Sequence, residues 1–276
     1  MTPQHTHEPE LHCPACIDQL TRFQTGLLPQ SDTEVVREHL NSCPDCRLFA
    51  DQVETVAGLV GSRAPTELPD NLSVLFDGVG DSPDDLADTV RSLYRLAATL
   101  DPDAPEDLVQ QTLLAALEQG PGALELSTLA QDLTDRSFGD PGPVVRSLND
   151  YETRTELRRA APDSDGDTAE LFYPDFYDAG PDAGRHVDTP NRWGPANTLS
   201  TEDDVFTADL YGVLDEAVAG LTDPLRQIVQ LVDIDNVSVA DAAQMLRLDQ
   251  DDTVDALHRA RIHLRGVVDQ AVSSGS

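Results

Sequence analysis

Four cysteines and one histidine lie close together near the start of this 276-residue chain. The cysteines form two pairs, Cys13-Pro-Ala-Cys16 and Cys43-Pro-Asp-Cys46, and the rest of the sequence contains none. His39 precedes Cys43 by four residues, so both side chains would lie on one face of a helix, and Cys46 follows one turn later. Three soft ligands that converge in this way need a fourth to complete a tetrahedral zinc site. We expect Cys13 or Cys16 to supply it, and the spacing leaves that choice open.

Two Cys-x-x-Cys pairs with a histidine nearby favour a metal over disulfides in a chain without an export signal. The N-terminal residues MTPQHTHEPELHC contain neither a basic segment nor an apolar core, and no stretch approaches the roughly 18 apolar residues of a membrane span. We therefore expect a cytoplasmic protein that binds Zn²⁺ and makes no membrane contact. Buried structural cysteines without a metal are the alternative, and they would leave the position of His39 unexplained.

The elements that would carry these ligands are helices. Ser31 followed by Glu34 predicts a capping box at the start of one helix, and a second helix is expected to begin at Pro44. The run RAPTELPD over 63–70 then predicts a linker. Residues 1–65 are accordingly expected to form a small zinc-binding helical domain.

The remainder of the chain predicts two further helical domains and a long connector, so the expected fold class is all-α. Apolar residues recur at helical steps over 71–138, and the segment 139–200 is acidic and rich in Gly and Pro, which predicts a flexible linker. Over 201–276, short helices, a tight turn and a longer helix make a helix-turn-helix the expected arrangement.

An aromatic cluster interrupts the predicted linker. Phe172, Tyr173, Phe176 and Tyr177 lie within six residues, and Trp193 follows. Large aromatic side chains are unusual in a disordered connector, so the cluster is interpreted as a docking segment; the alternative is a loop that packs locally on a domain.

The zinc constellation resembles the zinc-binding anti-sigma family, in which an early Cys or His is followed at a distance by His-x3-Cys-x2-Cys. Cys13 has the family's spacing from His39. Cys16 is an additional thiol, either the true fourth ligand or a spare that could exchange when the site is oxidised. The resemblance implies a module that binds sigma-like domains and covers their working surfaces.

Two further segments resemble extracytoplasmic-function sigma factors. Leu93-Tyr94-Arg95-Leu96-Ala97 and the stretch from Pro105 to Thr112 are similar to the family's second conserved region, whose helix docks on the clamp of core RNA polymerase. The polymerase contacts that this resemblance implies are Glu106, Asp107 and Gln110. The run of arginines with which the family opens promoter DNA is largely missing here.

The last segment resembles the family's fourth conserved region, which recognises promoter DNA. The DNA contacts that it implies are Thr253, His258, Arg259, Arg261 and Arg265. The chain departs from the family in the turn, where Arg247 and Asp249 replace Gly and Pro, and where aspartates open the recognition helix (Asp251, Asp252 and Asp255). Carboxylates at this place should weaken DNA binding. The alternative for the arginines is a solvated helix face that forms i,i+4 ion pairs.

The overall charge also opposes contact with nucleic acid. The formal net charge is −33, and all 18 basic residues are arginines. Such a field repels DNA at long range, so promoter binding must depend on a local basic patch or on a partner. A genome that favours Asp and Arg would give the same composition without a functional reason.

These observations predict a regulator rather than an enzyme, since no nucleophile with its base, phosphate loop or catalytic carboxylate pair is recognisable. The leading hypothesis is a sigma factor that binds core RNA polymerase and promoter DNA and is inhibited by intramolecular contact with its own zinc domain. The alternative is a degenerate sigma-like regulator that acts by protein contacts without binding promoters. A zinc redox sensor on a helical scaffold is a third possibility.

Overall fold

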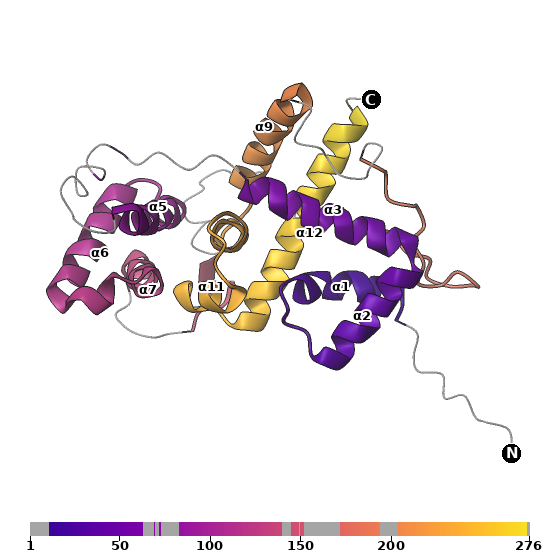
Figure 1. The fold of residues 1–276 in the computed structure, drawn as a ribbon, viewed down its shortest axis with the longest axis horizontal. Helices are drawn as coiled ribbons and strands as arrows, with labels where there is room; N and C mark the ends of the chain where they lie inside the picture. The colour runs from indigo at the N-terminus through magenta and orange to yellow at the C-terminus, as the bar shows by residue number, and fades with distance from the viewer. Residues whose placement is uncertain are drawn as a thin grey trace, which may run out of the picture. The chain divides into compact units, whose positions relative to one another are not determined.

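The computed structural model describes residues 11–62, 69, 72, 83–139, 145–148, 150–151, 172–193 and 204–274. Regular structure in these ranges is helical, apart from two isolated β-bridges (Figure 1). This confirms the all-α fold class. No helix among them has the length and apolar character that a membrane span requires. Most of the two predicted linkers, over 63–70 and 139–200, lies outside the described residues.

Prolines begin several of the helices. Pro44, Pro83 and Pro105 open α3, α5 and α6, where the missing N–H has no intrahelical partner to lose. Ser238 caps α11, because its hydroxyl accepts a hydrogen bond from the Asp241 backbone N–H at 3.1 Å. The bounds are α1 Cys13–Gln24, α2 Gln30–Ser42, α3 Pro44–Gly61, α5 Pro83–Leu100, α6 Pro105–Gln119, η2 Pro121–Leu124, α7 Leu126–Phe138, α9 Asp204–Gly220, α10 Leu225–Val229, η4 Gln230–Ile234, α11 Val239–Met245 and α12 Gln250–Ser274.

The start of α2 differs from the predicted capping box. The helix begins at Gln30, directly after Pro29, and no side chain caps it. Ser31 lies inside the first turn, and its hydroxyl donates to the carboxylate of Asp32 at 3.1 Å. The sequence signature fails because Pro29, with φ −54° and ψ 150°, already turns the chain into the helix one residue earlier.

The chain divides into two compact units, and each combines stretches that are distant in the sequence. Unit 1 contains residues 1–57, 167–214 and 261–276, and unit 2 contains residues 58–166 and 215–260. The helices α3, α9 and α12 each contribute residues to both units.

Unit 1 has its core between the cysteine-bearing helices. Ile17, Leu20, Phe49 and Val53 from α1 and α3 are buried there. Ile262 of α12 fills the same core, although more than 200 residues separate it from Phe49. The zinc-ligand helices are therefore packed together with the second half of α12.

Residues 172–193, which fall within the predicted linker, also belong to unit 1 and form a closed turn. Phe176 and His186 pair in an isolated antiparallel bridge, and the Tyr177 backbone N–H donates to the carbonyl of Arg185 at 2.9 Å. Tyr173 and Phe176 pack against the core, and Trp193 is fully buried. The aromatic cluster thus packs locally on unit 1, except that Tyr177 is 45% exposed.

Unit 2 is a helical bundle. The helices α5, α6 and α7 pack on one another, α7 packs on α11, and α5 contacts α10 and η4. Leu93, Leu96 and Leu133 are among the fully buried residues of this core. The Tyr151 hydroxyl donates to the Leu246 carbonyl at 2.5 Å, which ties the segment after α7 to α11.

An ion cluster joins α7 to the turn between α11 and α12 inside unit 2. Arg247 donates to both carboxylate oxygens of Asp135, at 3.3 Å from Nε and 2.8 Å from the terminal nitrogen. Arg146 contacts the same carboxylate at 3.5 Å. Arg247 has φ +57°, in the left-handed region that favours glycine. Arg247 therefore adopts a backbone conformation that is more usual for glycine.

Candidate metal centre

The ends of three helices bring the predicted ligands to one place. Cys13 begins α1, His39 lies in the last turn of α2, and Cys46 lies in the first turn of α3. Cys43 follows the last residue of α2 with an extended backbone, φ −107° and ψ 105°, and Pro44 then starts α3. The extended residue and the proline break the helix between His39 and Cys46, and this break turns the two halves of the motif toward a common point.

The geometry of the four ligand atoms fits a tetrahedral ion. Cys13 Sγ lies 3.8 Å from Cys43 Sγ, and His39 Nε2 lies 3.3 Å from Cys46 Sγ. All four atoms lie within 4.8 Å of one another. Zinc–ligand bonds of normal length would place two sulfurs about 3.8 Å apart and a sulfur and a nitrogen about 3.6 Å apart. The donor set of three thiols and one imidazole is one that zinc prefers.

The surroundings of two of the thiols disfavour the thiolate form when no metal ion is bound. Burial raises the pKa of the Cys13 thiol, and a hydrogen bond with Cys16, followed by burial, raises the pKa of the Cys46 thiol. Thiols in such surroundings become thiolates when a metal ion compensates their charge. Cys13, His39, Cys43 and Cys46 therefore form a zinc-binding site.

Cys16 lies beside this site but outside the ligand set. It is fully buried, yet its sulfur is not among the four atoms that converge. The four cysteines form no disulfide. The choice that the sequence left open thus falls on Cys13, with Cys16 as a neighbouring thiol.

His186 is a functional residue that the sequence analysis missed. Its Nε2 lies 3.3 Å from Cys46 Sγ. The side chain is 7% exposed, and burial lowers the pKa of the imidazole. His186 lies 140 residues beyond Cys46, so no spacing rule connects the two. The only signal in the sequence was the aromatic cluster that precedes it.

The residues predicted to contact DNA are unequally accessible. Arg261 and Arg265 are each 7% exposed, and Thr253 is fully buried. His258 and Arg259 are partly exposed. Thr253 donates its hydroxyl hydrogen bond to the Asp249 carbonyl at 2.7 Å. In this conformation, only His258 and Arg259 of the five offer a side chain to a ligand in solvent.

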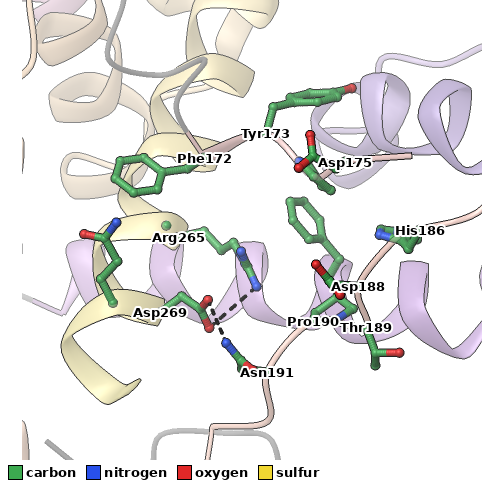
Figure 2. A pocket seen from close by; sticks show the side chains of 14 residues that line it. Phe172, Tyr173, Asp175, His186, Asp188, Thr189, Pro190, Asn191, Arg265 and Asp269 are labelled. Carbon is green, nitrogen blue, oxygen red and sulfur yellow. Dashed lines mark hydrogen bonds and ion pairs between the residues drawn. The ribbon is translucent and has the colours of Figure 1, made fainter. Parts of the chain in front are cut away.

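Arg265 makes its contacts within unit 1. Its guanidinium donates twice to Gln52 Oε1, at 3.0 and 2.7 Å, and lies 4.7 Å from the ring centre of Phe49. Asp269 is 3.7 Å away, one turn along α12 (Figure 2). A phosphate contact by Arg265 would require these bonds to break.

The residues predicted to contact polymerase lie at the start of α6. Asp107 is exposed, and Glu106 and Gln110 are partly exposed. Further along the helix, Leu114 and Leu117 are 62% and 63% exposed. Asp107, Leu114 and Leu117 follow one another at helical spacing, so α6 presents an accessible face with an apolar end.

Comparison with known proteins assigns the zinc site and leaves the rest of the chain unassigned. Residues 13–47 match the model of the family described as "Putative zinc-finger". No curated protein and no solved structure matches the chain. The matched residues span all four zinc ligands and Cys16. Residues 13–47 are thus similar to a family of zinc fingers, in agreement with the four converging ligands.

Proposed function

We propose that this protein is a regulator of transcription initiation that acts through protein contacts, with its zinc finger joined to sigma-like helices. The zinc finger supports the anti-sigma part of this proposal. The resemblance of the segments around Glu106 and Arg259 to sigma factors supports the rest.

The burial of Arg265 is the observation that favours protein contacts over promoter binding. Arg261 is equally buried, whereas Asp251, Asp252 and Asp255 at the start of α12 are exposed. The surface at the start of this helix is therefore acidic, and phosphate groups would be repelled from it.

The accessible face of α6 is the proposed contact with core RNA polymerase. It combines the acidic Asp107 with the exposed Leu114 and Leu117. Exposed leucines on a helix are typical of surfaces that a partner covers, and a nearby charge can set the orientation of the partner.

A sigma factor inhibited by its own zinc finger is the second candidate. Ile262 and Arg265, which belong to the segment that resembles the promoter-reading region, are packed with the zinc-finger helices in unit 1. Such packing is what inhibition within one chain would use, because it withholds Arg265 from DNA.

Pull-down with core RNA polymerase tests the first proposal on the full chain. Replacing both Leu114 and Leu117 by Asp should lower the affinity about tenfold or more, since each substitution removes apolar contact and adds a buried charge. Val145→Asp is the matched control, because Val145 is 73% exposed and lies outside α6. Equal binding by the double variant and the control would contradict the assignment of α6.

A zinc-ligand variant separates the two candidates. Cys43→Ser should weaken the zinc finger without removing any part of unit 1, unlike deletion of residues 1–65, which would also expose Ile262. Increased polymerase binding together with promoter-specific transcription would favour the inhibited sigma factor. Unchanged or weaker polymerase binding, with no transcription, would favour the regulator that acts by protein contacts.

A further inference from the structure

One segment outside the zinc finger touches the thiols of the zinc site. We call this segment, residues 172–193, the clasp. His186 of the clasp makes the side-chain contact, since its imidazole Nε2 lies 3.3 Å from Cys46 Sγ. Its Nδ1 is buried and has no hydrogen-bond partner. The imidazole is therefore held in place by its contact with Cys46 and by the packing around it.

The clasp approaches the start of α1 through Gly184. The Gly184 carbonyl accepts a hydrogen bond from the Cys13 backbone N–H at 3.1 Å, which satisfies one of the free donors of the first turn. Gly184 has φ +75°, and a Cβ there would lie 3.1 Å from the side chain of His12. Both the backbone conformation and the close approach require glycine at this position.

The other end of the clasp is anchored to α3 and α12. The Gln52 side chain donates to the Asn191 carbonyl at 2.5 Å, and Trp193 Nε1 donates to the Asp269 carboxylate at 2.8 Å. Asn191 also donates to Asp269, at 3.3 Å (Figure 2). His186 and Asn191 both line a cavity of about 530 Å³ beside Arg265. The clasp thus connects the zinc site to α12 within unit 1.

We infer that the clasp is an outer part of the zinc site, in which His186 is a positioning residue that donates a hydrogen bond from Nε2 to the zinc-bound thiolate of Cys46. Three thiolates and one neutral imidazole leave the zinc complex with one net negative charge. Hydrogen-bond donors to the sulfur atoms delocalise this charge. Removing such a hydrogen-bond partner of a metal ligand typically lowers the metal affinity by about 10- to 100-fold. His186 supplies such a donor to Cys46, one of the three thiolates.

Zinc binding and docking of the clasp are consequently linked. If docking of the clasp raises the zinc affinity, then zinc binding must favour docking of the clasp by the same free energy. Zinc therefore stabilises the docked clasp, and through Asn191 and Trp193 it strengthens the attachment of the clasp to α12. Packing of Tyr173 and Phe176 alone would dock the clasp equally well with and without zinc.

Zinc affinity, measured by competition with a chromophoric chelator, tests this linkage on the full chain. His186→Ala and Gly184→Ala should each lower the affinity about tenfold or more. Gly180→Ala is the matched control: Gly180 also has a positive φ, +95°, but a Cβ there meets nothing within 4 Å. Wild-type affinity in either clasp variant, or an equal loss in the control, would overturn the proposal.

The emission of the single tryptophan reports the clasp directly. At saturating zinc, Gly184→Ala should shift Trp193 emission to longer wavelength, because the indole leaves its buried site while the zinc finger stays loaded. Unchanged emission in this variant would mean that the clasp stays docked, and the linkage would fail.

Cobalt substitution and a conservative variant test the role of His186 itself. His186→Ala should leave the visible bands of the Co²⁺ protein in place, since the four ligands are intact, and His186→Gln should restore much of the zinc affinity through its amide donor. A shift of the Co²⁺ bands would make His186 a direct ligand and overturn the outer role. Equal losses in the Ala and Gln variants would exclude hydrogen-bond donation.

Discussion

Cys13 and Cys16 are two buried thiols on the same helix with different roles. Cys13 lies with His39, Cys43 and Cys46 in the converging set, while Cys16 contacts Cys46 from outside it. A thiol outside the ligand set can contact a zinc-bound sulfur only weakly, without a metal bond. The two substitutions therefore remove interactions of very different strength.

We expect purified protein to contain one zinc per chain, and Cys13→Ser and Cys16→Ser to affect it unequally. Loss of one of four ligands should weaken zinc binding roughly 100- to 1,000-fold, a quarter of the binding free energy of a structural site. Loss of the outer thiol should weaken it about tenfold at most. Elemental analysis after chelator competition measures both. A greater loss in Cys16→Ser than in Cys13→Ser would reverse the assignment.

The residue types and spacing were sufficient to predict most of the zinc site. His39, Cys43 and Cys46 are joined by helical periodicity, which is a local property of the sequence. The choice of Cys13 over Cys16 depends on how α1 packs against α2, and the position of His186 depends on the path of a segment 140 residues away. Both are tertiary effects, and neither leaves a periodic trace in the sequence.

The turn between α11 and α12 shows how one element is held by another. Arg247 occupies a left-handed conformation that costs an L-residue about 1–2 kcal/mol. Its bidentate contact with Asp135 of α7, which is mostly buried, offsets this strain. The arginine therefore joins the turn to α7, which a glycine at this position could not do.

Two substitutions of Arg247 should separate strain from ion pairing. Arg247→Ala keeps the strained backbone and loses the contact with Asp135, so it should destabilise unit 2 by about 2–3 kcal/mol. Arg247→Gly also loses the contact but relieves about 1 kcal/mol of strain. Urea unfolding should therefore give the order wild type, Gly variant, Ala variant from most to least stable. An Ala variant as stable as the Gly variant would show that the backbone is not strained.

The element boundaries were predictable where proline defines them and less so elsewhere. The predicted start at Pro44 is confirmed, because the restriction on φ is local. Ser31 failed as a cap because Pro29 had already begun the turn. The clasp could not be derived from periodicity, since its turn is closed by the Phe176–His186 bridge and by contacts with α1 and α12 rather than by a regular pattern.

The net charge of −33 and the absence of lysine affect the whole molecule. The excess negative charge repels polyanions such as DNA, and this repulsion weakens as added salt shortens the Debye length. The proposed polymerase contact at α6 depends mainly on apolar surface and should be less sensitive to salt than any contact with DNA.

Removing the exposed aspartates at the start of α12 should test whether charge alone prevents DNA binding. Replacing Asp251, Asp252 and Asp255 by Asn should raise duplex DNA affinity roughly tenfold at low salt, because like-charge contacts are relieved. The gain should be independent of DNA sequence and should disappear as salt is raised, since Arg265 remains buried. Filter binding across a salt series measures it. A gain confined to one promoter sequence would instead indicate specific recognition.

Unit 1 is assembled from three separate stretches of the chain, and this affects how it folds during translation. Ligands from His39 to Cys46 emerge early, but the roughly 200 residues between Cys46 and Ile262 take on the order of 10 to 40 s to synthesise. During this interval the nascent zinc finger lacks Ile262, which completes its core, and for the first 140 residues it also lacks His186, which contacts Cys46. The nascent chain can therefore capture zinc before it can retain it tightly, and metal retention matures only as translation nears the end of α12.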